Sequence, residues 1–130
     1  MSSSISNEES YPGTNFSSFL IHSRKDIKVI LFDEVMYCKA ESNYTRIYLR
    51  NGKIVMTCKT LKEMEFMLVA SQFVRIHASY VVNLNAVRRI IHAGQCSVEL
   101  VNTMILNVSR SRRKELVCLF EDHYSHSVQD

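Results

Sequence analysis

The stretch FVRIHASYVVN, residues 73–83, alternates apolar and polar side chains in the manner of a half-buried β-strand. The apolar side of such a strand would carry Val74, Ile76, Ala78, Tyr80 and Val82. Its polar side would carry Arg75, His77 and Ser79 in a row. That side is either a solvated face or a surface that contacts a partner.

Short alternating runs surround this stretch, and they predict further strands at 19–23, 27–31, 35–40, 45–50, 53–59, 88–92, 96–100 and 103–108. Asn51-Gly52 is a strong signal for a two-residue hairpin turn. Thr60 and Glu63 form a capping box, which predicts a helix over 61–69. Because strands follow one another along the chain, we expect a mainly β fold with antiparallel sheets and two short helices.

The second helix is expected from Arg110 to Phe120, with Ser109 as its N-cap and Leu116, Leu119 and Phe120 buried. Its first turn is crowded with cations and hydroxyls: Ser109, Arg110, Ser111, Arg112, Arg113 and Lys114. Cations oppose the positive end of a helix dipole, so this placement favours a bound phosphate over a merely solvated helix end.

With 130 residues, the chain has room for one domain. We expect a flexible N-terminal segment at 1–18, rich in Ser, Asn and Glu with one Pro-Gly pair, a folded domain at 19–120, and a loose C-terminal tail at 121–130. The longest apolar run, at 66–70, is too short to span a membrane, and no signal pattern is present. The sequence therefore predicts a cytoplasmic protein that does not contact a membrane.

The predicted domain is strongly basic. All 16 Lys and Arg residues lie between Arg24 and Lys114, whereas eight of the 13 acids lie within 19–120, which gives this region a net charge of +8. Such a surplus favours a polyanionic partner, although charge alone does not separate DNA from RNA, an acidic membrane or a simply soluble basic domain.

Catalysis and cofactors find little support. No phosphate-cradling, nucleophile-elbow or zinc-protease motif occurs, and a lone histidine such as His77 on a strand is usually structural. The four cysteines form no CxxC pair, so we expect all four to be buried, reduced thiols; a metal site at His92 and Cys96 is the weaker alternative. The sequence predicts a protein that is not an enzyme and needs no cofactor.

A second candidate surface lies at the turn Glu41-Ser42-Asn43, which is followed by Tyr44 and Thr45. Amide, phenol and hydroxyl groups can read base edges or bind phosphate oxygens. Ser-Asn is equally ordinary turn chemistry, so this segment alone does not decide between the two interpretations.

Taken in order, FDEVMYCKAESNYTRIYLRNGK, TLKEME, FVRIHASYVVNLNAV and LNVSRSRRKEL resemble the LytTR family of bacterial DNA-binding domains over residues 27–120. The resemblance implies stacked antiparallel sheets whose edge loops, rather than a recognition helix, enter the major groove. It places base contacts at Tyr44, Ala78 and Ser111. It places further contacts at Asn43, Thr45, Lys59, His77, Ser79, Ser109, Arg110 and Arg113.

If Ala78 meets DNA, it cannot lie in an uninterrupted strand beside Ile76, so the resemblance also predicts a break at 77–79 that lifts this tripeptide into an edge loop. Alanine offers a base only its methyl group.

The resemblance implies a transcriptional regulator that binds double-stranded DNA, at imperfect direct repeats near promoters, with possible self-association on DNA. Family members often serve as output domains behind a receiver domain. No receiver fits in this chain, which is a stand-alone regulator or a fragment. The alternative is a protein-interaction or scaffold domain of the same fold that does not read DNA, and RNA binding ranks third because exposed aromatic residues are few.

Overall fold

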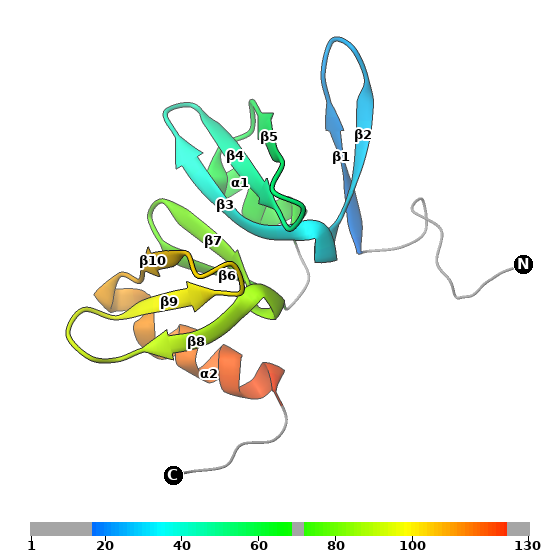
Figure 1. Cartoon of the computed structure of the whole chain (residues 1–130). Helices are drawn as coiled ribbons and strands as arrows, with labels where there is room; N and C mark the ends of the chain where they lie inside the picture. The colour runs from blue at the N-terminus through cyan, green and yellow to red at the C-terminus, as the bar shows by residue number, and fades with distance from the viewer. Residues whose placement is uncertain (1–16, 69–71, 125–130) are drawn as a thin grey trace, which may run out of the picture.

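A computed structural model describes residues 17–68 and 72–124 of the chain (Figure 1). The elements run in the order β1 (Ser18–His22), β2 (Ile27–Leu31), η2 (Phe32–Glu34), β3 (Val35–Glu41), β4 (Tyr44–Leu49), β5 (Ile54–Thr57), α1 (Leu61–Met67), β6 (Phe73–His77), β7 (Tyr80–Asn83), η3 (Leu84–Ala86), β8 (Val87–Ile91), β9 (Ser97–Leu100), β10 (Ile105–Asn107), η4 (Arg110–Arg112) and α2 (Arg113–His123). The strands form three antiparallel sheets with the orders β1-β2, β5-β4-β3-β7-β6 and β10-β9-β8. The expected fold, mainly β with antiparallel sheets and two helices, is confirmed.

The five-stranded sheet is the central layer and buries apolar side chains on both faces. One core lies between this sheet, the three-stranded sheet and α2, and it includes Ile76, Val98 and Leu116, each 0% exposed. The second core lies on the opposite face, under the β1-β2 hairpin and α1, and includes Ile47 and Met64. In Figure 1 the β1-β2 hairpin stands at the upper right, α1 lies behind β3 and β4, and α2 lies at the bottom, below β8.

Helix α1 begins where its capping box predicts. The Thr60 hydroxyl accepts a hydrogen bond from the Glu63 backbone N–H at 3.2 Å, and the Glu63 carboxylate accepts one from the Thr60 N–H at 2.8 Å. The bond from the Thr60 N–H, and then a bond from the Thr60 hydroxyl to Glu63 Oε1 at 3.2 Å, hold the pKa of Glu63 below its usual value. The helix ends at Met67, and the last predicted position, 69, lies outside the described residues.

Residues 73–83 form two strands and not one. β6 and β7 pair with each other in antiparallel register, with Val74 opposite Val82, and the chain reverses at Ala78 and Ser79. The break expected at 77–79 is present at Ala78 and Ser79, where the chain reverses its direction completely, whereas His77 remains in β6. Ala78 is exposed, whereas Ile76 is fully buried.

The C-terminal helix differs from its prediction at both ends. A 3-10 turn, η4, precedes α2, and α2 continues to His123, three residues beyond the expected end. The Ser109 side chain makes no capping bond; its backbone N–H donates instead to the Ile76 carbonyl at 2.9 Å. Leu116 is buried, while Leu119 and Phe120 are partly buried.

The predicted end segments fall largely outside the described residues, because these exclude 1–16 and 125–130. β1 already begins at Ser18. Among the described residues, no helix combines the length and the apolar character needed to cross a membrane.

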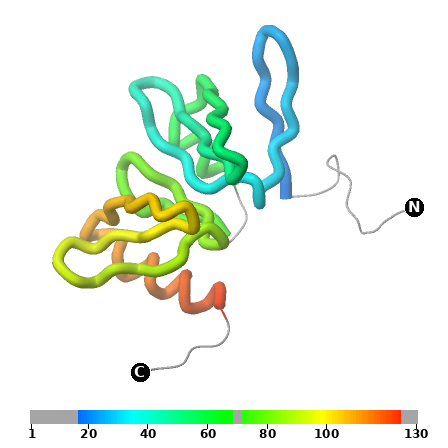
Figure 2. Tube along the Cα trace, viewed as in Figure 1, coloured from blue at the N-terminus to red at the C-terminus, as the bar shows by residue number. Residues whose placement is uncertain are grey.

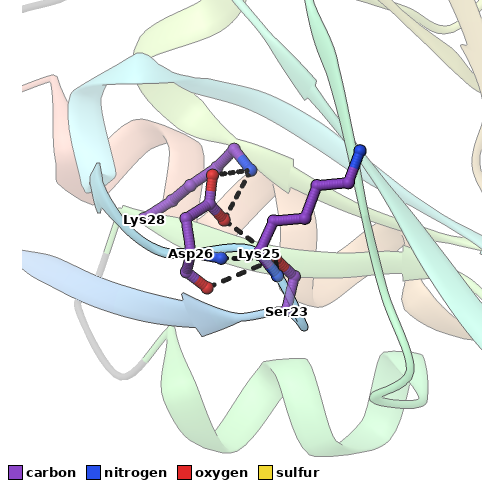
Figure 3. A network of polar contacts seen from close by, with 4 residues as sticks. All are labelled: Ser23, Lys25, Asp26 and Lys28. Carbon is purple, nitrogen blue, oxygen red and sulfur yellow. Dashed lines mark hydrogen bonds and ion pairs between the residues drawn. The ribbon is translucent and has the colours of Figure 1, made fainter.

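Hydrogen bonds and an ion pair stabilise the tip of the β1-β2 hairpin, as Figure 3 shows. The Ser23 hydroxyl donates to the Asp26 carboxylate at 2.8 Å, and Lys28 Nζ lies 3.1 Å from both Asp26 carboxylate oxygens. The hydroxyl and then the ammonium hold the pKa of Asp26 below its usual value. One face of the hairpin packs on the core; the other carries the exposed side chains of Leu20, Ile27, Val29 and Leu31.

The cysteine prediction is half wrong. Cys38 and Cys96 are buried, but Cys58 and Cys118 are exposed, and all four are free. Cys58 lies in the connection between β5 and α1, and Cys118 lies two residues after the buried Leu116, on the opposite side of α2. Burial raises the pKa of the Cys38 thiol to about 12.

Candidate nucleic-acid interface

Three connections meet along one edge of the stacked sheets, which we call the turn edge: the β3-β4 turn (42–43), the β6-β7 turn (78–79) and the β10-α2 connection (108–112). The Ala40 N–H at the end of β3 donates to the Ser79 carbonyl at 2.9 Å, and the Ser109 N–H donates to the Ile76 carbonyl at 2.9 Å. The β6-β7 turn therefore lies between the other two. Figure 2 shows the three connections along the left side of the molecule.

The β3-β4 turn presents the polar side chains that the sequence singled out. Ser42 adopts a positive φ of 55°, and Asn43 is exposed beside the half-buried Tyr44. Below the turn, Arg46 Nε lies 3.3 Å from Glu41 Oε1. The neighbouring hydroxyl of Tyr48 and then the Glu41 carboxylate raise the pKa of Arg46, so this side chain remains a cation.

Thr45 lies in the interior, unlike the other predicted contact residues. It is 0% exposed, and its hydroxyl donates to the Lys59 carbonyl at 2.8 Å. Its side chain thus has no access to a partner; it fixes the start of the connection to α1, where Lys59 is exposed. The Thr45–Lys59 bond places Lys59 next to the β3-β4 turn.

The β6-β7 turn is hydrogen-bonded from within. His77 Nδ1 accepts from the Ser79 N–H at 3.0 Å, which leaves Nε2 as the protonated nitrogen of the neutral ring. The Arg75 guanidinium donates to the carbonyls of His77 and Ala78 at 2.8 and 2.7 Å. The His77 ring also packs against Tyr80, with ring centroids 5.5 Å apart.

Beside this turn lies a hollow of about 520 Å³, which we call the edge hollow; it is lined by His77, Gly94, Gln95, Cys96, Val108, Ser109, Arg110 and Arg113. None of the described residues that line it is acidic. This concave surface carries an imidazole, a hydroxyl, a carboxamide and two guanidinium groups. All of these groups can donate hydrogen bonds to the oxygens of an anion.

The edge hollow brings His77 together with Ser109, Arg110 and Arg113, which the sequence places in a second, distant segment. Ser111 lies outside the hollow, exposed on η4. Arg113 Nη2 also lies 3.3 Å from His92 Nδ1, so the β8-β9 turn approaches the start of α2. No group of three or more metal-ligating side chains occurs among the described residues.

Sequence reasoning missed Gln95 and Arg75. Gly94, with a φ of +69°, turns the chain between β8 and β9 and leaves Gln95 exposed at the hollow. The sequence signals a turn at this point, but only the pairing of the sheets shows which edge the turn occupies. Arg75 was assigned to the polar side of a strand, and its contact with the turn depends on the reversal at Ala78.

Comparison with known proteins places the chain in a family and supports the fold. The model of the LytTr DNA-binding domain family matches residues 25–121. The fold is similar to that of the LytTr DNA-binding domain of a putative methyl-accepting/DNA response regulator from Bacillus cereus, with a TM-score of 0.68 and 23% sequence identity, covering 79% of this chain and 95% of that one. Curated proteins give no match.

Proposed function

Because the chain belongs to the LytTR family of DNA-binding domains, we propose that it binds double-stranded DNA sequence-specifically through its turn edge, in the major groove, and regulates transcription. The observation that carries the proposal is the edge hollow, where two arginines and His77 lie beside the β6-β7 turn and no acidic residue occurs among the described residues of the lining. The proposal includes a cytoplasmic location and imperfect direct repeats near promoters as targets, on which copies of the protein associate.

The cations and the small polar groups have different roles in this proposal. Arg110, Arg113 and Lys59 bind backbone phosphates, which supply affinity but carry no sequence information. Tyr44, Ala78 and Ser111 meet base edges. Around them, Asn43, His77, Ser79 and Ser109 supply further polar contacts.

Ala78 and Ser111 limit what can be read. A methyl group discriminates chiefly by contact with the methyl group of thymine, and a serine hydroxyl accepts several bases. Tyr44 and Gln95 therefore add to the thymine contact of Ala78, because the Gln95 carboxamide can form the paired bonds that recognise adenine. An edge that had lost base reading but kept its fold would instead serve protein interaction.

Fluorescence anisotropy tests the proposal with duplexes selected from a random library and a salt series. The double variant Arg110→Ala/Arg113→Ala is expected to weaken binding to all duplexes and to make the salt slope shallower by about two, one for each lost phosphate contact. Arg24→Ala/Lys25→Ala is the matched control, because it removes the same charge from the exposed hairpin tip.

The control should retain nearly the wild-type slope. No binding at low salt, or a salt slope near zero for the wild type, would exclude DNA binding. Equal weakening by both double variants would show that overall charge, and not the turn edge, binds the duplex. Competition between the duplex and single-stranded RNA tests the remaining alternative, RNA binding, because an RNA-binding protein would be displaced from the duplex by the RNA.

A further inference from the structure

Arg75 extends from β6 toward the β6-β7 turn, and its side chain is only 17% exposed. Its guanidinium makes three contacts. Nε donates to the His77 carbonyl at 2.8 Å, Nη2 donates to the Ala78 carbonyl at 2.7 Å, and Nη1 lies 2.5 Å from Glu65 Oε1. One planar group thus binds two successive carbonyls of the turn and a carboxylate of α1.

The local sequence of this turn does not specify its conformation. Two-residue hairpin turns usually contain Gly, Asn or Asp at positions with positive φ. Here the turn residues are Ala78 and Ser79, and the non-glycine residues with positive φ in the described chain are Ser42 and Thr103. The pairing of β6 with β7 is also irregular between Arg75 and His77. The conformation therefore depends on hydrogen bonds: the Ser79 N–H donates to His77 Nδ1 at 3.0 Å, and further bonds come from outside the turn.

Those bonds come from two directions. From β3, the Ala40 N–H donates to the Ser79 carbonyl at 2.9 Å, which fixes the side of the turn next to the β3-β4 turn. Arg75 fixes the His77 and Ala78 carbonyls. Since those carbonyls are directed at the guanidinium, the methyl group of Ala78 is left exposed at the turn edge.

Glu65 determines where the guanidinium lies. It belongs to α1, which begins at its capping box and is buried through Leu61 and Met64. Anchored there, the carboxylate holds Arg75 against the inner side of the turn and neutralises a cation that would otherwise be available to phosphates. The rigid fork of arginine suits this arrangement, whereas the single ammonium of lysine does not.

We infer that Arg75, held by Glu65, is a positioning residue that sets the conformation in which the β6-β7 turn meets DNA, without contacting DNA itself. This inference rests on the proposed function. It separates two kinds of arginine in the domain: Arg110 and Arg113 act by charge on phosphates, while Arg75 acts by geometry on a base-reading turn.

Arg75→Lys is the sharpest test, because it keeps the charge and removes the fork. We expect its preference for a selected duplex over a scrambled one to fall about tenfold, the size of one lost base contact, with an unchanged salt slope. Glu65→Gln keeps an oxygen acceptor for Arg75, so its preference for the selected duplex should fall less. Arg89→Lys is the control: Arg89 Nε lies 2.5 Å from Glu99 Oε1 in an exposed ion pair on the three-stranded sheet.

Amide NMR spectra of the same variants report the turn directly: the signals of Ala78 and Ser79 should shift in Arg75→Lys and remain in place in Arg89→Lys. Folding is checked by circular dichroism, and Arg75→Gln serves if the lysine variant is unfolded. A wild-type preference in both Arg75 variants, with DNA binding intact, would overturn the inference alone. A wild type that binds no duplex would overturn the proposed function and the inference with it.

Discussion

Replacing Asn83 with alanine is expected to destabilise the fold by about 3 kcal/mol. Asn83 is 0% exposed at the end of β7, and its Nδ2 donates to the carbonyls of Val35 at 2.8 Å and Phe32 at 3.3 Å. Its Oδ1 accepts from the Asn85 N–H at 2.9 Å. Removing the donor from the buried Val35 carbonyl costs roughly 2 kcal/mol, and the lost Asn85 bond adds roughly 1 kcal/mol; the longer bond to Phe32 adds little.

Urea denaturation followed by circular dichroism measures this loss. Asn83→Asp should be at least as damaging near neutral pH, because a carboxylate cannot donate to either carbonyl and would be buried as an unpaired charge. Asn107→Ala on β10 is the control; Asn107 is exposed, so its replacement should change the free energy of unfolding by no more than about 0.5 kcal/mol. A similarly small change for Asn83→Ala would refute the reasoning.

Three further outcomes are expected in the same unfolding assay. Leu116→Ala, at a fully buried position of α2, should cost about 2–5 kcal/mol, whereas Thr60→Ala should cost about 1 kcal/mol through loss of its cap. Burial raises the pKa values of Tyr37 and Cys38 to about 12, so the fold holds both groups neutral while the unfolded chain ionises them first. The free energy of unfolding is therefore highest below about pH 9 and falls as the pH rises toward 12, by up to about 1.4 kcal/mol per pH unit for each of the two groups. Cys38→Ala should remove the contribution of the thiol to this pH dependence.

Local sequence signals predicted the parts of the fold that short-range bonds determine. The capping box at Thr60 and Glu63 predicted the start of α1, and the hairpin expected at Asn51-Gly52 joins β4 to β5, although its connection spans 50–53 rather than two residues. The alternating runs predicted the strands, because strands such as β4 and β6 alternate between buried and partly exposed side chains. The order of strands in the sheets depends on distant contacts and did not follow from these patterns.

The reversal at Ala78 shows why local sequence patterns could not predict part of the site. The residues of 73–83 alternate as in one continuous strand, whereas the turn is held by bonds from Arg75 and Ala40 to its carbonyls and from the Ser79 N–H to His77. Only the family resemblance predicted a break there. Thr45 is a different case: it shares a parity with the buried Ile47 and Leu49, so its burial was already present in the pattern.

Two of the four thiols are buried in different cores, so the rate at which each is alkylated reports how often its own core opens. Cys38 belongs to the core beneath the β1-β2 hairpin and α1, and Cys96 to the core beneath α2. An alkylating reagent will modify Cys58 and Cys118 at once and the two buried thiols only when their own core opens. Mass spectrometry of the modified peptides over time would therefore give one opening rate for each core. A difference between the two rates would identify the core that opens more readily.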